Sequence, residues 1–358
     1  MTESDFLPKQ EYVLQKSGSI TCQSPSNIAL VKYWGKYGEQ LPKNASISFT
    51  LSNCHTTTTL HFDKKNSKGF EFKVILDGKR ETSFEPKIQK FFDRISTYVP
   101  FLSEYAFTIE TFNSFPHSSG IASSASGMAA LSCCLVKLER ECSAMPQPTA
   151  YYTMKASFLA RLGSGSAARS IEGPLVVWGA HSEIENSSNL VGIKFTGTLH
   201  QIFRDYHDTI LLVDKGEKQV SSTVGHDLMH GHPFAKQRFT QANDNISKLL
   251  PVLAAGDVPN FIEIVESEAL SLHAMMLSSR PYFILMKPNT LEIIERIWRF
   301  RRETGSSVCF TLDAGANVHV LYPAVEKEAV QRFIADELAT FCKNGEFIND
   351  ECGLGTVL

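Results

Sequence analysis

The sequence predicts an α+β protein of two domains, and three observations support this prediction. The chain has 358 residues, which at about 100–200 residues per domain favours two domains over one. Hydrophobic residues make up 43%, an ordinary fraction for a globular protein. Strand-like and helix-like segments both occur, without the regular alternation of a doubly wound parallel sheet. We expect domains at 1–200 and 201–358, because polar stretches at 182–189 and 196–200 interrupt the core pattern.

Composition narrows the class of protein. The 35 basic and 38 acidic residues give a formal charge of −3, which argues against a disordered tail protein and against a protein that coats nucleic acid. No apolar run reaches the roughly 18 residues of a membrane span, and the N-terminus lacks the apolar core of a secretory signal. The 8 cysteines include no C-x-x-C pair. We therefore expect a soluble, cytoplasmic protein with reduced cysteines and neither membrane nor nucleic acid as a partner.

The first half reads as strands followed by two helices. Period-two alternation predicts strands at 46–51, 55–62, 70–76 and 107–111, with a link at 52–53 and a hairpin turn at Asp77–Gly78. Small and apolar residues predict helices at 123–139 and 150–162, the second ending at Gly163 as a left-handed cap. The apolar run 175–178 follows.

The second half carries longer amphipathic helices. A strand is expected at 209–213, and apolar residues recur at helical spacing across 261–276. A helix begins at Asn289 or Thr290 and ends before Gly305. Strands at 307–312 and 318–322 enclose the turn D-A-G-A-N, and a last helix spans 325–342.

A glycine- and serine-rich segment, F-P-H-S-S-G-I-A-S-S-A-S-G-M-A-A at 115–130, is the main candidate for binding phosphate. The chain contains neither G-x-x-x-x-G-K-[ST] nor G-x-G-x-x-G. Exposed amides at a helix N-terminus attract anions, and small side chains let the backbone approach a phosphate. The alternative is a helix cap followed by close helix packing.

Two further segments carry positive charge. In A-R-L-G-S-G-S-A-A-R-S at 160–170, Arg169 can form a fork onto a phosphate or carboxylate. In N-I-A-L-V-K-Y-W-G-K at 27–36, Lys32, Trp34 and Lys36 share one face if a strand continues, with Tyr33 opposite. The alternatives are a flexible surface loop and an edge strand with solvated lysines.

Asp313 ends an apolar strand before a glycine turn. Such an aspartate usually stabilises the turn, but it becomes a candidate base if the strand aims it into a cleft lined by lysines. His226, His230 and His232 form an H-x3-H-x-H group whose first two members fit one helix face. Because no fourth ligand is nearby and Pro233 breaks the helix, a metal site here is disfavoured.

Together the four segments, in this order from about Ser24 to Tyr322, resemble the diphosphomevalonate decarboxylases of the GHMP kinase superfamily. The resemblance implies a ribosomal-protein-S5-like N-terminal domain, a ferredoxin-like C-terminal α/β sandwich and an active site in the cleft between them. It implies ATP-dependent decarboxylation of (R)-5-diphosphomevalonate to isopentenyl diphosphate, ADP, phosphate and CO2. It also implies a homodimer.

The resemblance carries roles onto matching residues. Asp313 matches the catalytic aspartate, Lys32 the lysine near the reacting groups, and Arg169 the arginine that orients the substrate carboxylate. The implied substrate contacts are Tyr33, Trp34, Lys36, Ser164, Gly165, Ser166 and Arg169. The implied ATP contacts are Pro116, His117, Ser118, Ser119, Gly120, Ile121, Ala122, Ser123 and Ser124, with Mg²⁺ at Ser123 and Ser124.

Alternatives within and outside the family stay open. An arginine that the family uses for the terminal phosphates has no clear match, and Arg80 and Lys87 are candidates. The substrate can therefore be the mono- or the diphosphate, so a phosphomevalonate decarboxylase or a mevalonate 3-kinase is the alternative enzyme. The role of Asp313, as proton acceptor or charge stabiliser, is also open. The other class is a non-catalytic ligand sensor, which has no need for the Lys32, Arg169 and Asp313 set.

Overall fold

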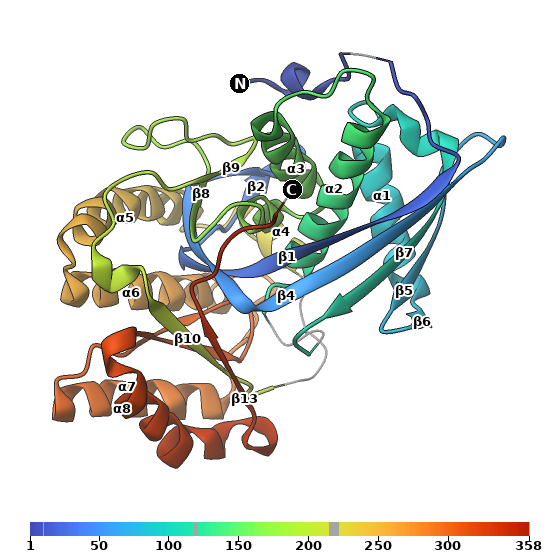
Figure 1. Ribbon diagram of the computed structural model, residues 1–358. Coiled ribbons are helices and arrows are strands. Elements are labelled where there is room, and N and C mark those ends of the chain that lie inside the picture. The colour runs from blue at the N-terminus through green and yellow to red at the C-terminus, as the bar shows by residue number, and fades with distance from the viewer. Residues whose placement is uncertain (10, 117–120, 215–221, 358) are drawn as a thin grey trace.

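The computed structural model describes residues 1–9, 11–116, 121–214 and 222–357, which two β-sheets organise (Figure 1). The strands of the first sheet run in the order β6-β5-β7-β4-β8-β9, and β1 pairs with β4. These strands are β1 (Ser17–Val31), β4 (Ser46–Lys64), β5 (Glu71–Leu76), β6 (Lys79–Arg80), β7 (Tyr105–Asn113), β8 (Leu175–Trp178) and β9 (Gly192–Lys194).

The second sheet has the order β11-β12-β10-β13. Its strands are β10 (Tyr206–Leu211), β11 (Cys309–Leu312), β12 (Val318–Pro323) and β13 (Phe347–Glu351), all paired antiparallel. A small hairpin, β2 (Lys36–Tyr37) with β3 (Leu41–Pro42), follows the end of β1.

Helices cover the first sheet on one side. α2 (Ser123–Cys142) packs against β1 and β4, and α3 (Thr149–Gly163) packs on α2 (Figure 1). Close approach is possible because the inner face of α2 is built from small, fully buried residues such as Ala129 and Cys133. α1 (Glu85–Ile95) lies against α3.

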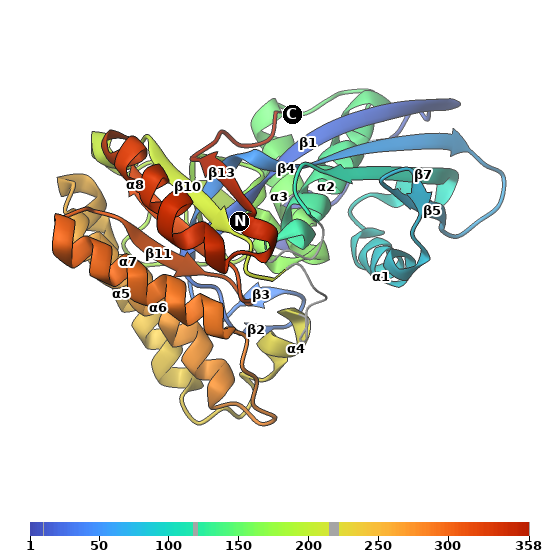
Figure 2. The same ribbon diagram turned by 90° about the horizontal axis from the view of Figure 1, so that it is seen from below.

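Helices pack on both faces of the second sheet (Figure 2). They are α5 (Ala235–Ala255), α6 (Val258–Leu277), α7 (Pro288–Thr304) and α8 (Lys327–Phe333). Apolar residues of α7 and α8, including Ile297 and Phe333, form one core cluster with Phe310 and Val320 of the sheet. The helical path of α8 continues as single turns to Phe341.

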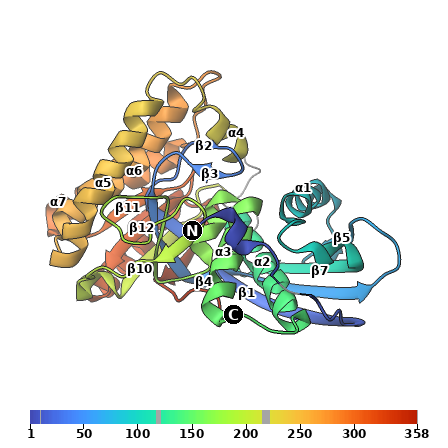
Figure 3. The ribbon, with the colours of Figure 1, turned by 90° about the horizontal axis from the view of Figure 1, so that it is seen from above.

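A shared core joins the two sheets. One cluster contains Val31 of β1 and Phe49 of β4 together with Ile210 of β10, Ile246 of α5 and Phe261 of α6. The carboxyl end of β1 is therefore fixed where the two halves of the molecule meet. The hairpin of β2 and β3 and the short helix α4 (Ser222–Asp227) gather beside this junction (Figure 3).

Most of the predicted elements are confirmed, but several details are wrong. The helix predicted to begin at Asn289 or Thr290 begins at Pro288, after Lys287 as its N-cap, and the hydroxyl of Thr290 accepts the amide of Lys287 at 3.1 Å. The strands predicted at 46–51 and 55–62 form one strand, β4, because the carboxylate of Asp350 accepts the amides of Ser52, Asn53 and Cys54 at 2.7–2.8 Å. Gly163 is not a left-handed cap. It is the last residue of α3, where a Cβ atom would lie 2.6 Å from the sulfur of Met128.

No helix in the described ranges is long and apolar enough to cross a membrane.

Candidate active site

Lys32 lies directly after β1, and the predicted continuation of the strand is wrong. Because β1 ends at Val31, the next side chains do not alternate, and Lys32, Tyr33 and Trp34 are all buried. The amide of Lys32 donates to Oε2 of Glu268 at 2.8 Å, and its Nζ donates to the carbonyl of Ala29 at 2.6 Å. Burial lowers the pKa of Lys32 to about 8, against the opposing effect of Asp313 and Glu268.

Glu268 of α6 is a fully buried carboxylate that fixes this turn. Its Oε2 accepts the Lys32 amide and Nη2 of Arg238. Its Oε1 accepts Nη1 of Arg238 at 2.9 Å and the side-chain amide of Asn245 at 2.6 Å. The buried charge is thus paired and hydrogen-bonded, as a carboxylate in a core must be.

Arg169 lies in the short 3-10 helix Gly165–Ser170 and is 3% exposed. Its Nη1 donates to Oγ of Ser46 at 2.7 Å, and its Nε donates to Oγ of Ser48 at 2.5 Å. Burial lowers its pKa to about 10, so the guanidinium stays charged at neutral pH. Because both hydroxyl partners are neutral, they orient the cation without cancelling its attraction for an anion.

Asp313 follows β11 and is half-buried. Its backbone carbonyl lies 3.1 Å from Nε2 of His273 on α6. A carbonyl only accepts, so Nε2 of His273 carries the proton. Burial lowers the pKa of His273 to about 4, which keeps this imidazole neutral. The carboxylate of Asp313 in turn attracts the charges of Lys32 and Arg169, opposing the effect of burial on their pKa values.

The three predicted catalytic residues line one pocket of about 60 Å³, which has room for a reacting group rather than a whole substrate. They come from three distant parts of the chain. The other lining residues are Asn27, Ala29, Tyr33, Trp34, Ala122, Ser166, His226, Leu272 and Ala314. Two cations against one carboxylate make the pocket suited to an anionic ligand.

The predicted phosphate loop adjoins the pocket through Ala122. His117, Ser118, Ser119 and Gly120 lie outside the described residues. Ala122 has a left-handed backbone, with φ of 43°, and its carbonyl accepts the amides of Ala125 and Ser126. The chain thereby enters α2 at Ser123, and the first amides of a helix need partners outside it. A strained residue at the mouth of a pocket is typical of a functional site.

Other predicted loop and substrate residues spread around the pocket. Pro116 is half-buried, and the carbonyl of Ile121 accepts from Oγ of Ser26 at 2.6 Å. Ser164 lies with its Oγ 3.5 Å from Oγ of Ser124, so it contacts the start of α2, whereas Ser166 lines the pocket.

Gly165 and Lys36 are not among the lining residues. A Cβ atom on Gly165 would lie 2.8 Å from the hydroxyl of Tyr33, so glycine permits the close approach of these two segments. Lys36 is in β2 and half-buried. Its ammonium is close enough to lower the pKa of His226.

Arg80 and Lys87, the two candidates for binding the terminal phosphates of the substrate, lie in different surroundings. Arg80 pairs with Glu85 at 3.1 Å on the surface. Lys87 of α1 donates from Nζ to Oγ of Ser124 and so lies beside the phosphate loop.

Glu268 and His273 are positioning groups that none of the sequence motifs indicated. Both fall on the stripe of α6 marked by Val265, Ala269 and Leu272, and all five are buried. A charged residue and a histidine on the apolar stripe of a helix are unusual, because a buried polar group needs a partner. That pattern is the signal from which they could have been found.

The histidines of the H-x3-H-x-H group diverge. His226 lines the pocket, His230 is exposed, and Nδ1 of His232 accepts the amide of Phe234 at 3.1 Å. Within the described part of the chain, no three histidine, cysteine, aspartate or glutamate side chains form a group that could hold a metal ion.

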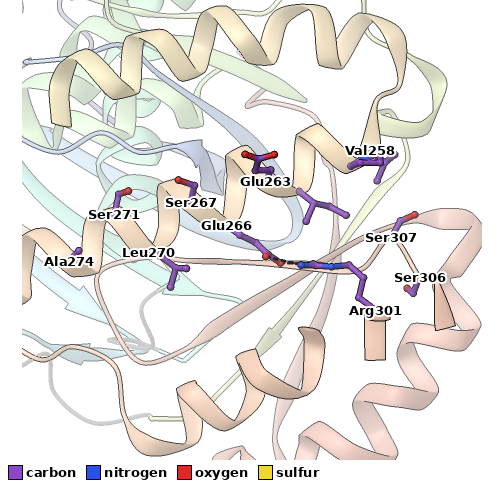
Figure 4. A pocket seen from close by; sticks show the side chains of 13 residues that line it. Val258, Glu263, Glu266, Ser267, Leu270, Ser271, Ala274, Arg301, Ser306 and Ser307 are labelled. Atoms are coloured by element: carbon purple, nitrogen blue, oxygen red, sulfur yellow. Dashed lines mark hydrogen bonds and ion pairs between the residues drawn. The ribbon is translucent and has the colours of Figure 1, made fainter. Parts of the chain in front are cut away.

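A larger pocket, of about 840 Å³, lies along α6 next to the end of α7 (Figure 4). Glu266 and Arg301 cross it as an ion pair, with Nη1 2.7 Å from Oε1, and Trp298 donates to the same carboxylate at 2.9 Å. Because Glu266 already neutralises the charge of Arg301, this pocket attracts an anion more weakly than the pocket of Lys32 and Arg169 does.

Comparisons with known proteins agree with the geometry. A family model described as a diphosphomevalonate decarboxylase-like N-terminal domain matches residues 24–189, and a mevalonate 5-diphosphate decarboxylase C-terminal domain matches 209–352. The chain is 31% identical to the diphosphomevalonate decarboxylase of Eremothecium gossypii, over 86% of this chain and 78% of the relative. It is 29% identical to that of Ganoderma lucidum, over 93% and 84%.

Solved structures give the same result. The complex of MDDEF with MVAPP, AMPPCP and magnesium has a TM-score of 0.80 at 28% identity, covering 95% of this chain and 98% of that one. The mevalonate diphosphate decarboxylase from Staphylococcus aureus has a TM-score of 0.79 at 27% identity, with the same coverage.

Proposed function

Because this chain belongs to the diphosphomevalonate decarboxylase family, we propose that it converts (R)-5-diphosphomevalonate and ATP to isopentenyl diphosphate, ADP, phosphate and CO2. This is an ATP-dependent decarboxylation in the mevalonate pathway of isoprenoid biosynthesis. The observation that carries the proposal is the pocket in which Lys32, Arg169 and Asp313 lie together. A non-catalytic sensor has no need for that set.

The chemistry follows from the charges of the pocket. The 3-hydroxyl oxygen attacks the γ-phosphorus of ATP, and ADP leaves. The new phosphate then leaves from C3 while the bond between C1 and C2 breaks, so that its electrons form the C2–C3 double bond and CO2 departs. We assign Asp313 to the hydroxyl proton or to the positive charge that develops at C3. We assign Arg169 to the substrate carboxylate and Lys32 to the oxygen that is phosphorylated and lost.

ATP is the co-substrate and Mg²⁺ accompanies its phosphates. Ser123 and Ser124 offer hydroxyl oxygens, which suit Mg²⁺ as ligands alongside phosphate oxygens and water. Because Lys87 donates to Ser124, we assign Ser123 to the metal and the Ser124–Lys87 pair to phosphate oxygens. When bound there, Mg²⁺ would supply positive charge to neutralise the phosphate oxygens of ATP and of the departing ADP.

The organisation of the protein is part of the proposal. We assign residues 1–200 and 201–358 to two domains whose facing surfaces form the site. We also propose a homodimer that acts in the cytoplasm. Support for a reducing compartment comes from the cysteines, since all 8 are free thiols and 7 of them are buried.

The test compares mevalonate, its 5-phosphate and its 5-diphosphate with ATP and Mg²⁺. We expect the diphosphate to give equal amounts of ADP and CO2, and the other two to react far more slowly. ADP without CO2 would make the protein a 3-kinase. Faster release of CO2 from the monophosphate would make it a phosphomevalonate decarboxylase, and binding without turnover would favour the sensor.

A further inference from the structure

His226 is a buried histidine that the chemistry above does not use. It belongs to α4, is 8% exposed, and lines the same pocket as Arg169 and Asp313. Its ring packs against two aromatic rings, both tilted by 37° to it, with centroids 4.2 Å away for Tyr33 and 4.7 Å away for Trp34. The imidazole is therefore held in one orientation by packing.

One hydrogen bond fixes which nitrogen carries the proton. Nδ1 of His226 accepts the backbone amide of Gly35 at 2.9 Å. An amide only donates, so Nδ1 must present a lone pair, and the neutral ring carries its proton on Nε2. Protonation of Nδ1 would break this bond. Burial, followed by the charges of Lys36 and Arg169, lowers the pKa of His226 to about 3, in agreement with a neutral ring.

The Nε2–H group is the part of His226 that remains for a ligand. Within the described ranges, the Gly35 amide is the hydrogen-bond partner of this imidazole. A donor that lines a pocket and is hydrogen-bonded to no side chain of the described residues is available to a bound molecule. The ligand must be an acceptor, and the neighbouring Arg169 and Lys36 favour one with negative charge.

We propose that His226 is a further substrate-binding residue, whose Nε2–H donates a hydrogen bond to an anionic oxygen of the mevalonate-side substrate. ATP is the less suitable acceptor, because His226 shares its pocket with Arg169 and Asp313, which are assigned to the carboxylate and the 3-hydroxyl of the mevalonate-side substrate. This inference rests on the proposed function for the identity of the ligand. The acceptor is a carboxylate or a phosphate oxygen, which the experiment below distinguishes.

Two substitutions separate the two nitrogens. In His226→Asn the side-chain oxygen can replace Nδ1 as acceptor for Gly35, but nothing reaches the position of Nε2. In His226→Gln the amide nitrogen can reach the position of Nε2, but the acceptor for Gly35 is lost. Both variants lose the ring that packs on Tyr33 and Trp34, so each is the packing control for the other.

The measurement is calorimetric binding of mevalonate 5-diphosphate. We expect His226→Asn to bind about tenfold to a hundredfold more weakly, the loss of one hydrogen bond to a charged group, and His226→Gln to bind within about threefold of wild type. Binding of a non-hydrolysable ATP analogue should be unchanged in both. Equal losses in the two variants, or wild-type binding by His226→Asn, would overturn the proposal.

Isopentenyl diphosphate, which lacks the carboxylate, identifies the acceptor. If His226→Asn binds this product as wild type does, the acceptor is at the carboxylate end; if it loses affinity for both ligands, the acceptor is the diphosphate. Nitrogen-15 spectra of histidine in the wild-type enzyme give a second readout that needs no variant. We expect Nε2–H for His226, shifted by mevalonate 5-diphosphate and not by the ATP analogue, and no such shift would contradict the proposal. CO2 release by the same wild-type sample tests the proposed function separately.

Discussion

At the scale of single residues, the charged groups of the pocket differ in how they are held. Arg169 is oriented by two serine hydroxyls, and Asp313 is held through its backbone carbonyl by His273. Lys32 donates to a backbone carbonyl, and its charge is buried without a carboxylate in direct contact. Of these three residues, Lys32 is therefore the one whose charge should lower the free energy of unfolding.

We predict that the stability cost of Lys32 disappears as pH rises. Its pKa is about 8 in the folded protein and 10.5 in the unfolded chain. Below pH 8 it is charged in both states, and between 8 and 10.5 the unfolded chain holds more protons, so the free energy of unfolding rises with pH. Relative to Lys32→Met, wild type should gain about 2–3 kcal/mol between pH 7 and pH 10 in denaturant titrations. The exposed substitution Lys43→Met should leave the wild-type pH dependence in place, and a constant difference between wild type and Lys32→Met would disprove the assignment.

At the scale of elements, periodicity located the strands and helices, but it did not indicate how they meet. The apolar stripe of 261–276 predicted α6 well, because a stripe on one face requires a partner. Ser52-Asn53 read as a link between strands, and only Asp350, distant in the sequence, explains why β4 continues. Likewise, sequence motifs pointed to Lys32, Arg169 and Asp313 as candidate catalytic residues. The suggested roles of His226 and Glu268 follow instead from their contacts with Gly35 and Lys32 in the folded chain.

Gly163 and Gly127 give a matched test of helix packing. Replacing glycine by alanine inside a helix gains about 1 kcal/mol from propensity. At Gly127 a Cβ atom has open space, so Gly127→Ala should stabilise the protein by about 0.5–1 kcal/mol. At Gly163 it would lie 2.6 Å from the sulfur of Met128 and 3.1 Å from Phe91, so Gly163→Ala should destabilise by about 1–3 kcal/mol. Thermal unfolding of both variants checks this, and stabilisation by Gly163→Ala would refute it.

The contact between α6 and the end of β1 predicts an effect on both stability and turnover. Glu268→Gln leaves the Arg238 charge buried without its carboxylate, which should cost about 3–5 kcal/mol of unfolding free energy. It also weakens the acceptor for the Lys32 amide, so CO2 release should fall even where the variant remains folded. Glu263→Gln, on the exposed side of the same helix, is the control. Equal stability of the two variants would show that the buried pair is not needed.

At the scale of the whole molecule, the site exists because two sheets share a core. β1 delivers Lys32, the turn after α3 delivers Arg169, and β11 of the other sheet delivers Asp313. The C-terminal segment reinforces this arrangement, because β13 belongs to the second sheet while Gly353 donates its amide to Thr50 in the first. The mixture of strands and helices predicted the α+β class, whereas the family resemblance, not periodicity, implied an active site in a cleft between two domains.

The central claim is that Lys32 and Asp313 act together on one substrate in one pocket, and a double-mutant cycle on CO2 release tests it most directly. Groups that act as a unit are non-additive. We predict that Asp313→Asn and Lys32→Met each lower the rate by about 10²–10⁴, and that the double variant is hardly slower than the worse single one. Two effects that multiply in the double variant would mean that the residues act independently and would contradict the account.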